Sequence, residues 1–277
     1  MRKRIKSVCA ILLIGICLVG ITMKANGDDQ ISHGTLISSP TFQHMEWVLE
    51  KEGLVFDSIE VSGTVKVLYL PVEGTFATAK LGGKGKEYLN TIQMEVEEKT
   101  LKIWPETQQP TILKEEEVPL IYIEGPPLTN VTVRENGDFV TLDIMKGKAL
   151  TVIATGAAQA EMRFQGTSVK AYGQESSEIE MYLDAQTLEV EGAGASELEW
   201  KGIVPKASYT LTEACEVEAQ KLESTHVVAQ VSGAGSLEVW AVESLDVQIS
   251  DAGRVEVKGN PKITKQISDV GALSFDD

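Results

Sequence analysis

The chain has 277 residues, of which 43% are hydrophobic and 24% are charged, with 25 Lys and Arg against 41 Asp and Glu. This apolar content is too high for a disordered chain, and the composition has neither a collagen-like nor a cysteine-rich bias. Residues 1–27 carry five bases and no acid, so residues 28–277 hold 20 bases and 41 acids, a net charge of −21. We expect a body this acidic to repel nucleic acid and anionic lipid, and acidic polysaccharide is disfavoured for the same reason.

The segment 1–27 has the pattern of a secretory signal peptide. Basic residues from Arg2 to Lys6 precede an apolar run from Val8 to Ile21, and Ala25-Asn26-Gly27 fits the small-x-small rule for cleavage. The run is shorter than the ~20 residues that span a bilayer, and no later run is long enough. We therefore expect export to the periplasm, cell surface or extracellular space, with no membrane span after cleavage. An uncleaved anchor is the alternative.

Only one cysteine follows the predicted signal. Cys9 and Cys17 lie within it, which leaves Cys215 and no possible internal disulfide. The neighbours of Cys215 include Glu213 and Glu216, and negative charges raise a thiol pKa. We expect Cys215 to be a packed residue and not a nucleophile.

The organisation of the remaining chain is a leader followed by one long β domain. Residues 28–52 are mixed and polar, and are predicted to be a leader or an N-terminal cap. From residue 53 to 277 the pattern is that of strands, interrupted by an exposed excursion at 105–117. The first strand-like segments are 55–70, 92–96, 101–104, 120–123 and 131–133.

A repeat dominates the C-terminal half. The segment from Ser232 to Val239 recurs at 250–257 and 268–275, and weaker copies precede it. The second motif position falls at residues 156, 173, 192, 213, 233, 251 and 269. A period of about 19 residues is too short for helical hairpins and fits one coil of a β-solenoid.

Alignment of the copies predicts rows of stacked side chains. One row is apolar and is expected to point inward; it comprises Met162, Ile179, Leu198, Ala219, Val239, Val257 and Phe275. The preceding position is acidic, and alternation along a strand places it outside. This candidate surface row comprises Glu161, Glu178, Glu197, Glu218, Glu238 and Glu256, and ends at Ser274.

Two interpretations of the glutamates remain open. Carboxylates at coil spacing could bind Ca²⁺, which takes oxygen ligands. The alternative, which we favour, is a solvated face whose repulsion is relieved by bases such as Arg163, Arg254 and Lys258. No Asp-x-Asp-x-Asp-Gly loop or nine-residue Gly-Asp repeat is present, so we expect no metal and no cofactor.

Catalysis is the alternative function, on fold analogy alone, because parallel β-helices include polysaccharide lyases and glycosidases. A lyase acting on uronates needs clustered bases, but residues 28–277 hold only Arg134, Arg163 and Arg254 as arginines. A glycosidase needs two opposed carboxylates, and nothing in the sequence selects such a pair. No catalytic residue is assigned. The four tryptophans could be platforms for sugar rings, although packing at corners is favoured; they are Trp47, Trp104, Trp200 and Trp240.

Several of these segments resemble one family of secreted bacterial domains. They are residues 56–63, 89–103, 121–133 with Pro126-Pro127, the Ser-Gly-Ala-Gly copies, and 259–263. Together they resemble the putative auto-transporter adhesin, head GIN family, over about residues 53–275. The resemblance implies an all-β, single-stranded, right-handed parallel β-helix. It also implies a non-catalytic adhesin-like or scaffold module, with a cell-surface protein or glycan as partner.

The C-terminal coil needs protection of its open end, because a solenoid exposes its interior and strand edges there. Phe275 occupies the last inward position of the repeat, and Asp276-Asp277 adds charge. We expect Phe275 to plug the end and the protein to be a monomer or weak dimer.

Overall fold

The computed structural model describes residues 46–84, 86–107, 113–114 and 117–276. The predicted signal at residues 1–27 and most of the predicted leader lie outside these residues. The unit Trp47–Asp277 is a β-solenoid of about eight coils with a period of about 19 residues, as the repeat predicts. The helix found in the described residues, α3 (Lys86–Leu89), has four residues.

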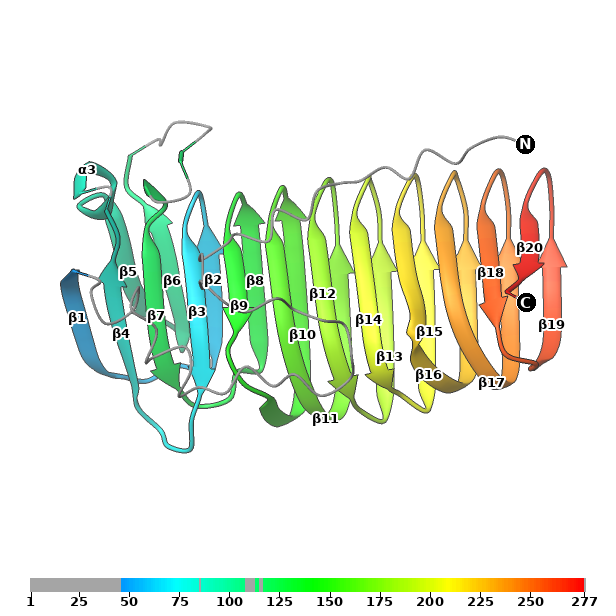
Figure 1. Cartoon of the computed structure of the whole chain (residues 1–277), viewed down its shortest axis with the longest axis horizontal. Coiled ribbons are helices and arrows are strands. Elements are labelled where there is room, and N and C mark those ends of the chain that lie inside the picture. The colour runs from blue at the N-terminus through cyan, green and yellow to red at the C-terminus, as the bar shows by residue number, and fades with distance from the viewer. Residues whose placement is uncertain (1–45, 85, 108–112, 115–116, 277) are drawn as a thin grey trace, which may run out of the picture. The chain divides into compact units, whose positions relative to one another are not determined.

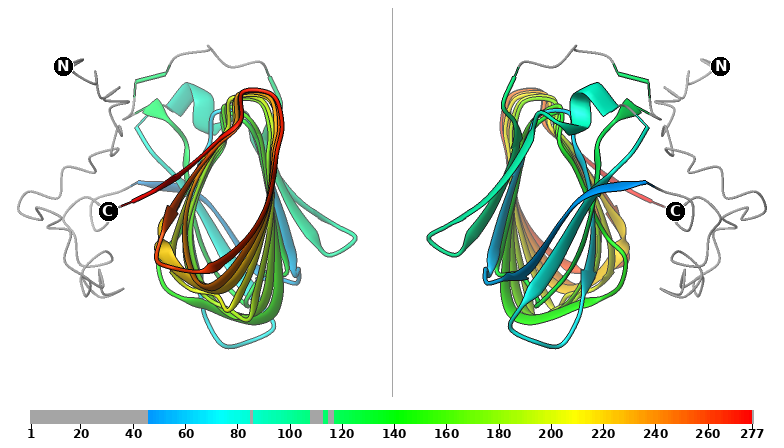
Figure 2. Two further views of the ribbon diagram at one scale, coloured as in Figure 1. Left: turned by 90° about the vertical axis from the view of Figure 1, so that its right-hand side faces the viewer. Right: turned by 90° about the vertical axis from the view of Figure 1, so that its left-hand side faces the viewer.

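Each regular coil contributes strands to two faces of one 20-stranded sheet, here called face A and face B, which meet at a narrow corner (Figures 1 and 2). Face A stacks in the order β1 (Trp47–Leu54), β4 (Ala77–Gly82), β7 (Leu120–Gly125), β3 (Lys66–Pro71), β9 (Asp138–Thr141), β11 (Gln159–Gly173), β12 (Glu178–Asp184), β14 (Glu197–Ile203), β16 (Glu216–Val231), β17 (Ser236–Ile249), β18 (Arg254–Lys258) and β20 (Ala272–Phe275). Face B stacks as β5 (Ile92–Glu97), β6 (Thr100–Pro105), β2 (Ser58–Ser62), β8 (Asn130–Glu135), β10 (Met145–Gly156), β11, β13 (Thr187–Gly192), β15 (Lys206–Leu211), β16, β17 and β19 (Lys262–Ile267). Strands β11, β16 and β17 bend and take part in both faces.

The N-terminal coils do not stack in sequence order. Strand β2 lies between β6 and β8, and β3 lies between β7 and β9, all in parallel pairing. Strands β4 and β5 then run antiparallel to their neighbours, and β1 pairs antiparallel with β4. This end of the stack is therefore closed by reversed strands. The expected domain start at residue 53 falls inside β1.

The core is a continuous column of apolar side chains between the two faces. Alternation along the strands places every second residue inside, so stacked coils bring these residues into contact. The largest fully buried side chains include Trp200, Tyr69, Tyr209, Phe139 and Phe164. Burial of each such side chain contributes about 1.5–3 kcal/mol, which makes the column the main source of stability.

The narrow corner depends on one residue per coil in the left-handed backbone region. These residues, all with φ between 54° and 82°, are Glu135, Gly156, Glu175, Gly194, Glu213, Gly233, Asp251 and Asp269. A side chain at Gly194 or Gly233 would meet the backbone of the coil below, so glycine is required there. The left-handed residue recurs once in every coil, at the solenoid's period of about 19 residues.

This register corrects two copies of the predicted motif. Alignment of the copies placed the corner at Gly173 and Gly192, two residues before the true positions Glu175 and Gly194. Gly192 is a glycine for another reason, since a Cβ there would overlap the Cys215 sulfur. Gly192 and Gly194 thus have different roles, and alignment of the copies placed the corner at Gly192 in place of Gly194.

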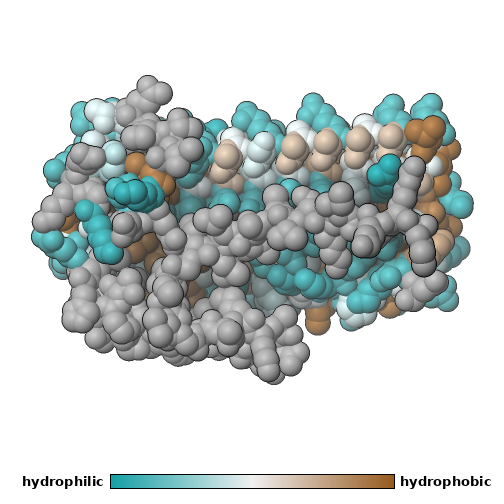
Figure 3. Space-filling view, turned by 45° about the horizontal axis from the view of Figure 1, so that its top comes forward, coloured by the Kyte–Doolittle hydropathy of each residue, from teal (hydrophilic) through white to brown (hydrophobic). Residues whose placement is uncertain are grey.

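The last coil contains Phe275, the residue expected to plug the end. Phe275 pairs with the buried Val257, so it does occupy the inward position. Its side chain is nevertheless 55% exposed, and Val270 beside the corner is 77% exposed. Hydrophobic side chains gather at this end of the stack in Figure 3. Val257 in the coil below is nevertheless completely buried, so the prediction that Phe275 plugs this end stays a prediction.

Candidate functional site

The predicted glutamate row exists on face A, but with two different members. Pairing between coils aligns six carboxylates, which we call the glutamate row: Glu161, Glu180, Glu199, Glu218, Glu238 and Glu256. The predicted members Glu178 and Glu197 lie instead in the adjacent row, in which Glu178 pairs with Glu197 and Glu197 pairs with Glu216. The exchange follows directly from the two-residue error at the corner.

Lysines neutralise the middle of the glutamate row. Lys201 forms ion pairs with Glu180 and with Glu199, the latter at 3.2 Å, and Lys221 lies 3.0 Å from Glu199. Burial opposes ionisation of Glu199, but the hydrogen bonds from Lys221 and Lys201 outweigh it and lower its pKa. Stacking of the coils therefore places lysines beside the carboxylates in the middle of the glutamate row, as expected for a solvated face.

Carboxylates without such lysine contacts behave differently. Burial, followed by the charges of Glu197 and Glu180, raises the pKa of Glu178. Burial and the charges of Glu199 and Glu216 likewise raise the pKa of Glu218.

Within the part of the chain that the structure describes, no group of three or more His, Cys, Asp or Glu side chains is arranged to hold a metal ion.

The single cysteine of residues 28–277 lies in the core. Cys215 is fully buried, Ser196 Oγ lies 3.2 Å from its sulfur as a hydrogen-bond donor, and burial raises its thiol pKa. A buried thiol with a raised pKa is a poor nucleophile, as expected from the sequence.

The tryptophans are divided between core and surface. Trp200 is completely buried. The Lys258 ammonium lies 3.9 Å from the centre of the Trp240 ring, and Trp47 packs against Tyr122 with ring centroids 6.4 Å apart. Trp104 lines a small recess of about 170 Å³ on face B. The structure thus brings none of the four together into a shared row.

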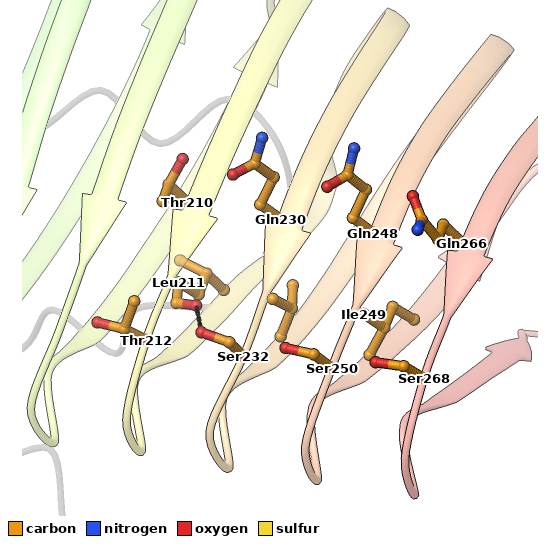
Figure 4. A pocket seen from close by; sticks show the side chains of 11 residues that line it. Thr210, Leu211, Thr212, Gln230, Ser232, Gln248, Ile249, Ser250, Gln266 and Ser268 are labelled. Carbon is orange, nitrogen blue, oxygen red and sulfur yellow. Dashed lines mark hydrogen bonds between the residues drawn. The ribbon is translucent and has the colours of Figure 1, made fainter.

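A larger hollow lies on face B, over the last four coils. It has a volume of about 300 Å³, and its walls come from β15, β16, β17, β19 and the residues that follow them. We call it the polar groove (Figure 4); it is lined by Thr210, Leu211, Thr212, Gln230, Val231, Ser232, Gln248, Ile249, Ser250, Gln266 and Ser268. None of these lining side chains titrates near neutral pH.

Two rows of polar side chains line the groove. Gln230, Gln248 and Gln266 are aligned by direct pairing between coils, with Thr210 in the same row. The second row, next to the narrow corner, comprises Thr212, Ser232, Ser250 and Ser268. In this row Ser232 donates a hydrogen bond to the Leu211 carbonyl at 3.3 Å. Its oxygen lone pairs remain available as acceptors.

Sequence reasoning overlooked this groove, although a signal was present. The residues before the left-handed corner read Gln-Val-Ser, Gln-Ile-Ser and Gln-Ile-Ser in the last three coils, ending at Ser232, Ser250 and Ser268. The apolar residue between the two polar ones points inward, so Gln and Ser share the outer surface. Among the outward-facing rows of the repeats, only the acidic one was predicted.

Comparison with known proteins identifies the family. Residues 55–261 match the family described as putative auto-transporter adhesin, head GIN domain. The chain belongs to this family. The predicted resemblance is thereby confirmed. No curated protein matches the chain.

Solved structures confirm the fold. A putative adhesin from Parabacteroides distasonis has a TM-score of 0.75 at 16% identity, with 83% of this chain and 95% of that chain covered. A putative adhesin from Parabacteroides merdae has a TM-score of 0.73 at 16% identity, with 84% and 96% covered. A putative lipid binding protein from Parabacteroides distasonis has a TM-score of 0.73 at 21% identity, with 84% and 97% covered. Across the described residues, no helix is both long and apolar enough to cross a membrane.

Proposed function

We propose that this chain is an exported, non-catalytic adhesin-like module that binds a cell-surface protein or glycan on the outside of the solenoid. The observation that supports this most directly is the polar groove, whose lining offers amide and hydroxyl groups but no side chain that could serve as a general acid or base at neutral pH. Membership of the head GIN adhesin family supports the same function.

The scaffold suits binding more than chemistry. Side chains on stacked coils are held at the strand spacing of ~4.8 Å by paired backbones on both sides. Such a surface is rigid before binding, so little conformational entropy is lost when a ligand binds. A predicted signal at residues 1–27 would deliver this surface outside the cytoplasm, where such ligands occur.

Two measurements on residues 28–277 test the proposal. Fluorescently labelled protein is applied to arrays of surface proteins and glycans, and saturable binding to members of one class is expected. In parallel, the protein is incubated with plant and host polysaccharides. Release of reducing or unsaturated ends, abolished by substitution of carboxylates, would establish the alternative of a polysaccharide lyase or glycosidase and overturn the proposal.

The oligomeric state is a separate expectation. A monomer or weak dimer is still predicted, although the exposed Phe275 and Val270 leave an apolar end on the stack. Light scattering of residues 28–277 over a concentration series measures this directly.

A further inference from the structure

The polar groove has the chemistry of a site for uncharged, hydroxyl-rich ligands. Gln230, Gln248 and Gln266 are exposed, and no hydrogen bond of their side chains is found among the described residues. Each amide offers two N–H donors and a carbonyl acceptor on the same side chain. Sugar hydroxyls, which both donate and accept, are matched by such groups.

Charge around the groove disfavours anionic ligands. The corner that forms its rim carries Asp251 and Asp269, and Asp246 lies in the adjacent row of face B. Asp251 already accepts hydrogen bonds from the Gly233 N–H at 3.2 Å and from Ser250 Oγ at 3.3 Å. With no base in the lining, a sialylated, sulfated or uronate chain would be repelled.

Most of the backbone within the groove is not available to a peptide strand. β15, β16 and β17 each pair with a strand on both sides, so their N–H and C=O groups are already used. Strand addition requires an unpaired edge, which along the groove is found at β19, since its described pairing is with β17. Along the other three strands a protein ligand meets side chains and no free backbone, and therefore gains less from them than a glycan does.

The repeat distance of the groove matches that of a linear glycan. Three successive coils present the same Gln and Ser pair every ~4.8 Å along the solenoid axis, and the coil before them presents Thr210 and Thr212 at the same positions. An extended chain of β-linked hexoses advances by roughly this spacing per sugar. A ligand lying along the axis would thus place one sugar beside each coil, and because alternate sugars of an extended β-1,4-linked chain are turned over, the Gln amides, which both donate and accept, would meet the two sugar faces in turn.

We propose that the polar groove binds a linear, uncharged, β-linked glycan along the solenoid axis, with one sugar beside each coil. This inference rests on the proposed binding function and specifies its ligand class and site. The lining has no aromatic platform, so each sugar contributes little and the affinity depends on the number of coils engaged.

Calorimetric titration of residues 28–277 with oligosaccharides tests the inference. The probes are β-1,4-glucose, β-1,3-glucose and β-1,4-mannose oligomers of two to six sugars, with oligogalacturonates as anionic controls. For at least one neutral series, affinity should rise with length and level off near four sugars. The oligogalacturonates should not bind.

Two matched triple variants locate the site. Gln230→Ala with Gln248→Ala and Gln266→Ala should weaken binding by about tenfold or more, since each lost hydrogen bond contributes modestly. Glu218→Gln with Glu238→Gln and Glu256→Gln changes the opposite face of the same three coils and should leave binding within about twofold. Circular dichroism and the thermal midpoint verify that both variants fold.

The outcomes separate this inference from the proposed function. Failure of every neutral series at millimolar concentration, or binding that is insensitive to the glutamine variant, overturns the groove assignment. A protein ligand that binds on the arrays and is lost in the glutamine variant also overturns it, while the adhesin-like function stands. Absence of any ligand on the arrays would count against the proposed function itself.

Discussion

Gly233 lies directly against the backbone of Glu213 in the preceding coil: a Cβ at Gly233 would be 2.8 Å from the Glu213 nitrogen. Both residues have left-handed backbones, with φ of 67° and 60°. At this step of the corner, the coil that follows Glu213 therefore needs a glycine. Acidic residues and glycines alternate in this way from Glu135 to Gly233, whereas Asp251 and Asp269 lie in consecutive coils and both carry side chains.

The corner predicts unequal effects of two substitutions. Gly233→Ala should lower the free energy of unfolding by about 2 kcal/mol or more, because a left-handed non-glycine residue costs ~1–2 kcal/mol and the new methyl also clashes. Glu213→Gly should change it by less than about 1 kcal/mol, since it removes a strained backbone at an entropic cost. Urea unfolding measures both, and equal losses would contradict the stacking argument.

Carboxylates on face A should have opposite effects on the pH dependence of stability. The raised pKa of Glu178 means that the folded state binds a proton more tightly than the unfolded state, so acidification from neutral pH favours folding. Glu178→Gln should therefore be more stable than the parent at pH 7, by under about 1 kcal/mol after solvent screening. The difference should shrink as the pH falls through the raised pKa.

Glu199→Gln is the matched control with the reverse sign. Burial opposes the ionisation of Glu199, but Lys221 and Lys201 outweigh it and lower the pKa, so the stabilisation is present at neutral pH and is lost as pH falls through the lowered value. The variant should be less stable at pH 7 and approach the parent in acid. Chemical denaturation between pH 3 and 7 tests both, and parallel profiles would contradict the assigned causes.

Two buried tyrosines should respond differently to loss of their hydroxyl groups. Tyr69 donates a hydrogen bond to the Pro126 carbonyl at 2.5 Å, whereas the Tyr209 hydroxyl is buried without a partner among the described residues. Tyr69→Phe should lower the free energy of unfolding by about 1 kcal/mol, and Tyr209→Phe should raise it by a similar amount. The measurement is thermal or urea unfolding, and a loss at both positions would indicate a bound water beside Tyr209.

Cys215 should be protected from thiol reagents in the folded protein. Its complete burial and raised pKa both suppress the reactive thiolate. In residues 28–277, labelling should follow the opening of the coils and become fast only in denaturant. Rapid labelling in native buffer would place the thiol at the surface, contrary to the structure. Cys215→Ala is the control for background reaction.

The repeats made the C-terminal half predictable, because each coil buries the same positions. Ser232 to Val239 and its copies define the period, the inward rows and the outward acidic row without any long-range information. The error at Gly173 and Gly192 shows the limit, since φ distinguishes the corner glycine from a packing glycine and is not written in the sequence. Glu178 and Glu197 were misplaced for this reason.

The N-terminal half was much less predictable. Several of its strands were predicted from alternation, but β1 and β4 were not, and the neighbours of each strand were not, because residues 55–135 carry no repeat that fixes the register. The placement of β2 between β6 and β8 depends on pairings of Ser58 with Thr100 and with Asn130, both of which are distant in the chain. The polar groove was not predicted for a different reason. Its repeated Gln and Ser residues are uncharged, whereas the acidic row stands out in the repeats by its charge.

The interleaving of the β2–β3 coil has a consequence for the order of folding. β2 and β3 precede all four of their partner strands in the chain, so both edges of this coil are paired only after β9 has been synthesised. Loop closure over such separations is slow, whereas each later coil needs only a neighbour about 19 residues away. We therefore expect formation of the closed end to be the slow step of folding, and the uniform coils to add to it more quickly.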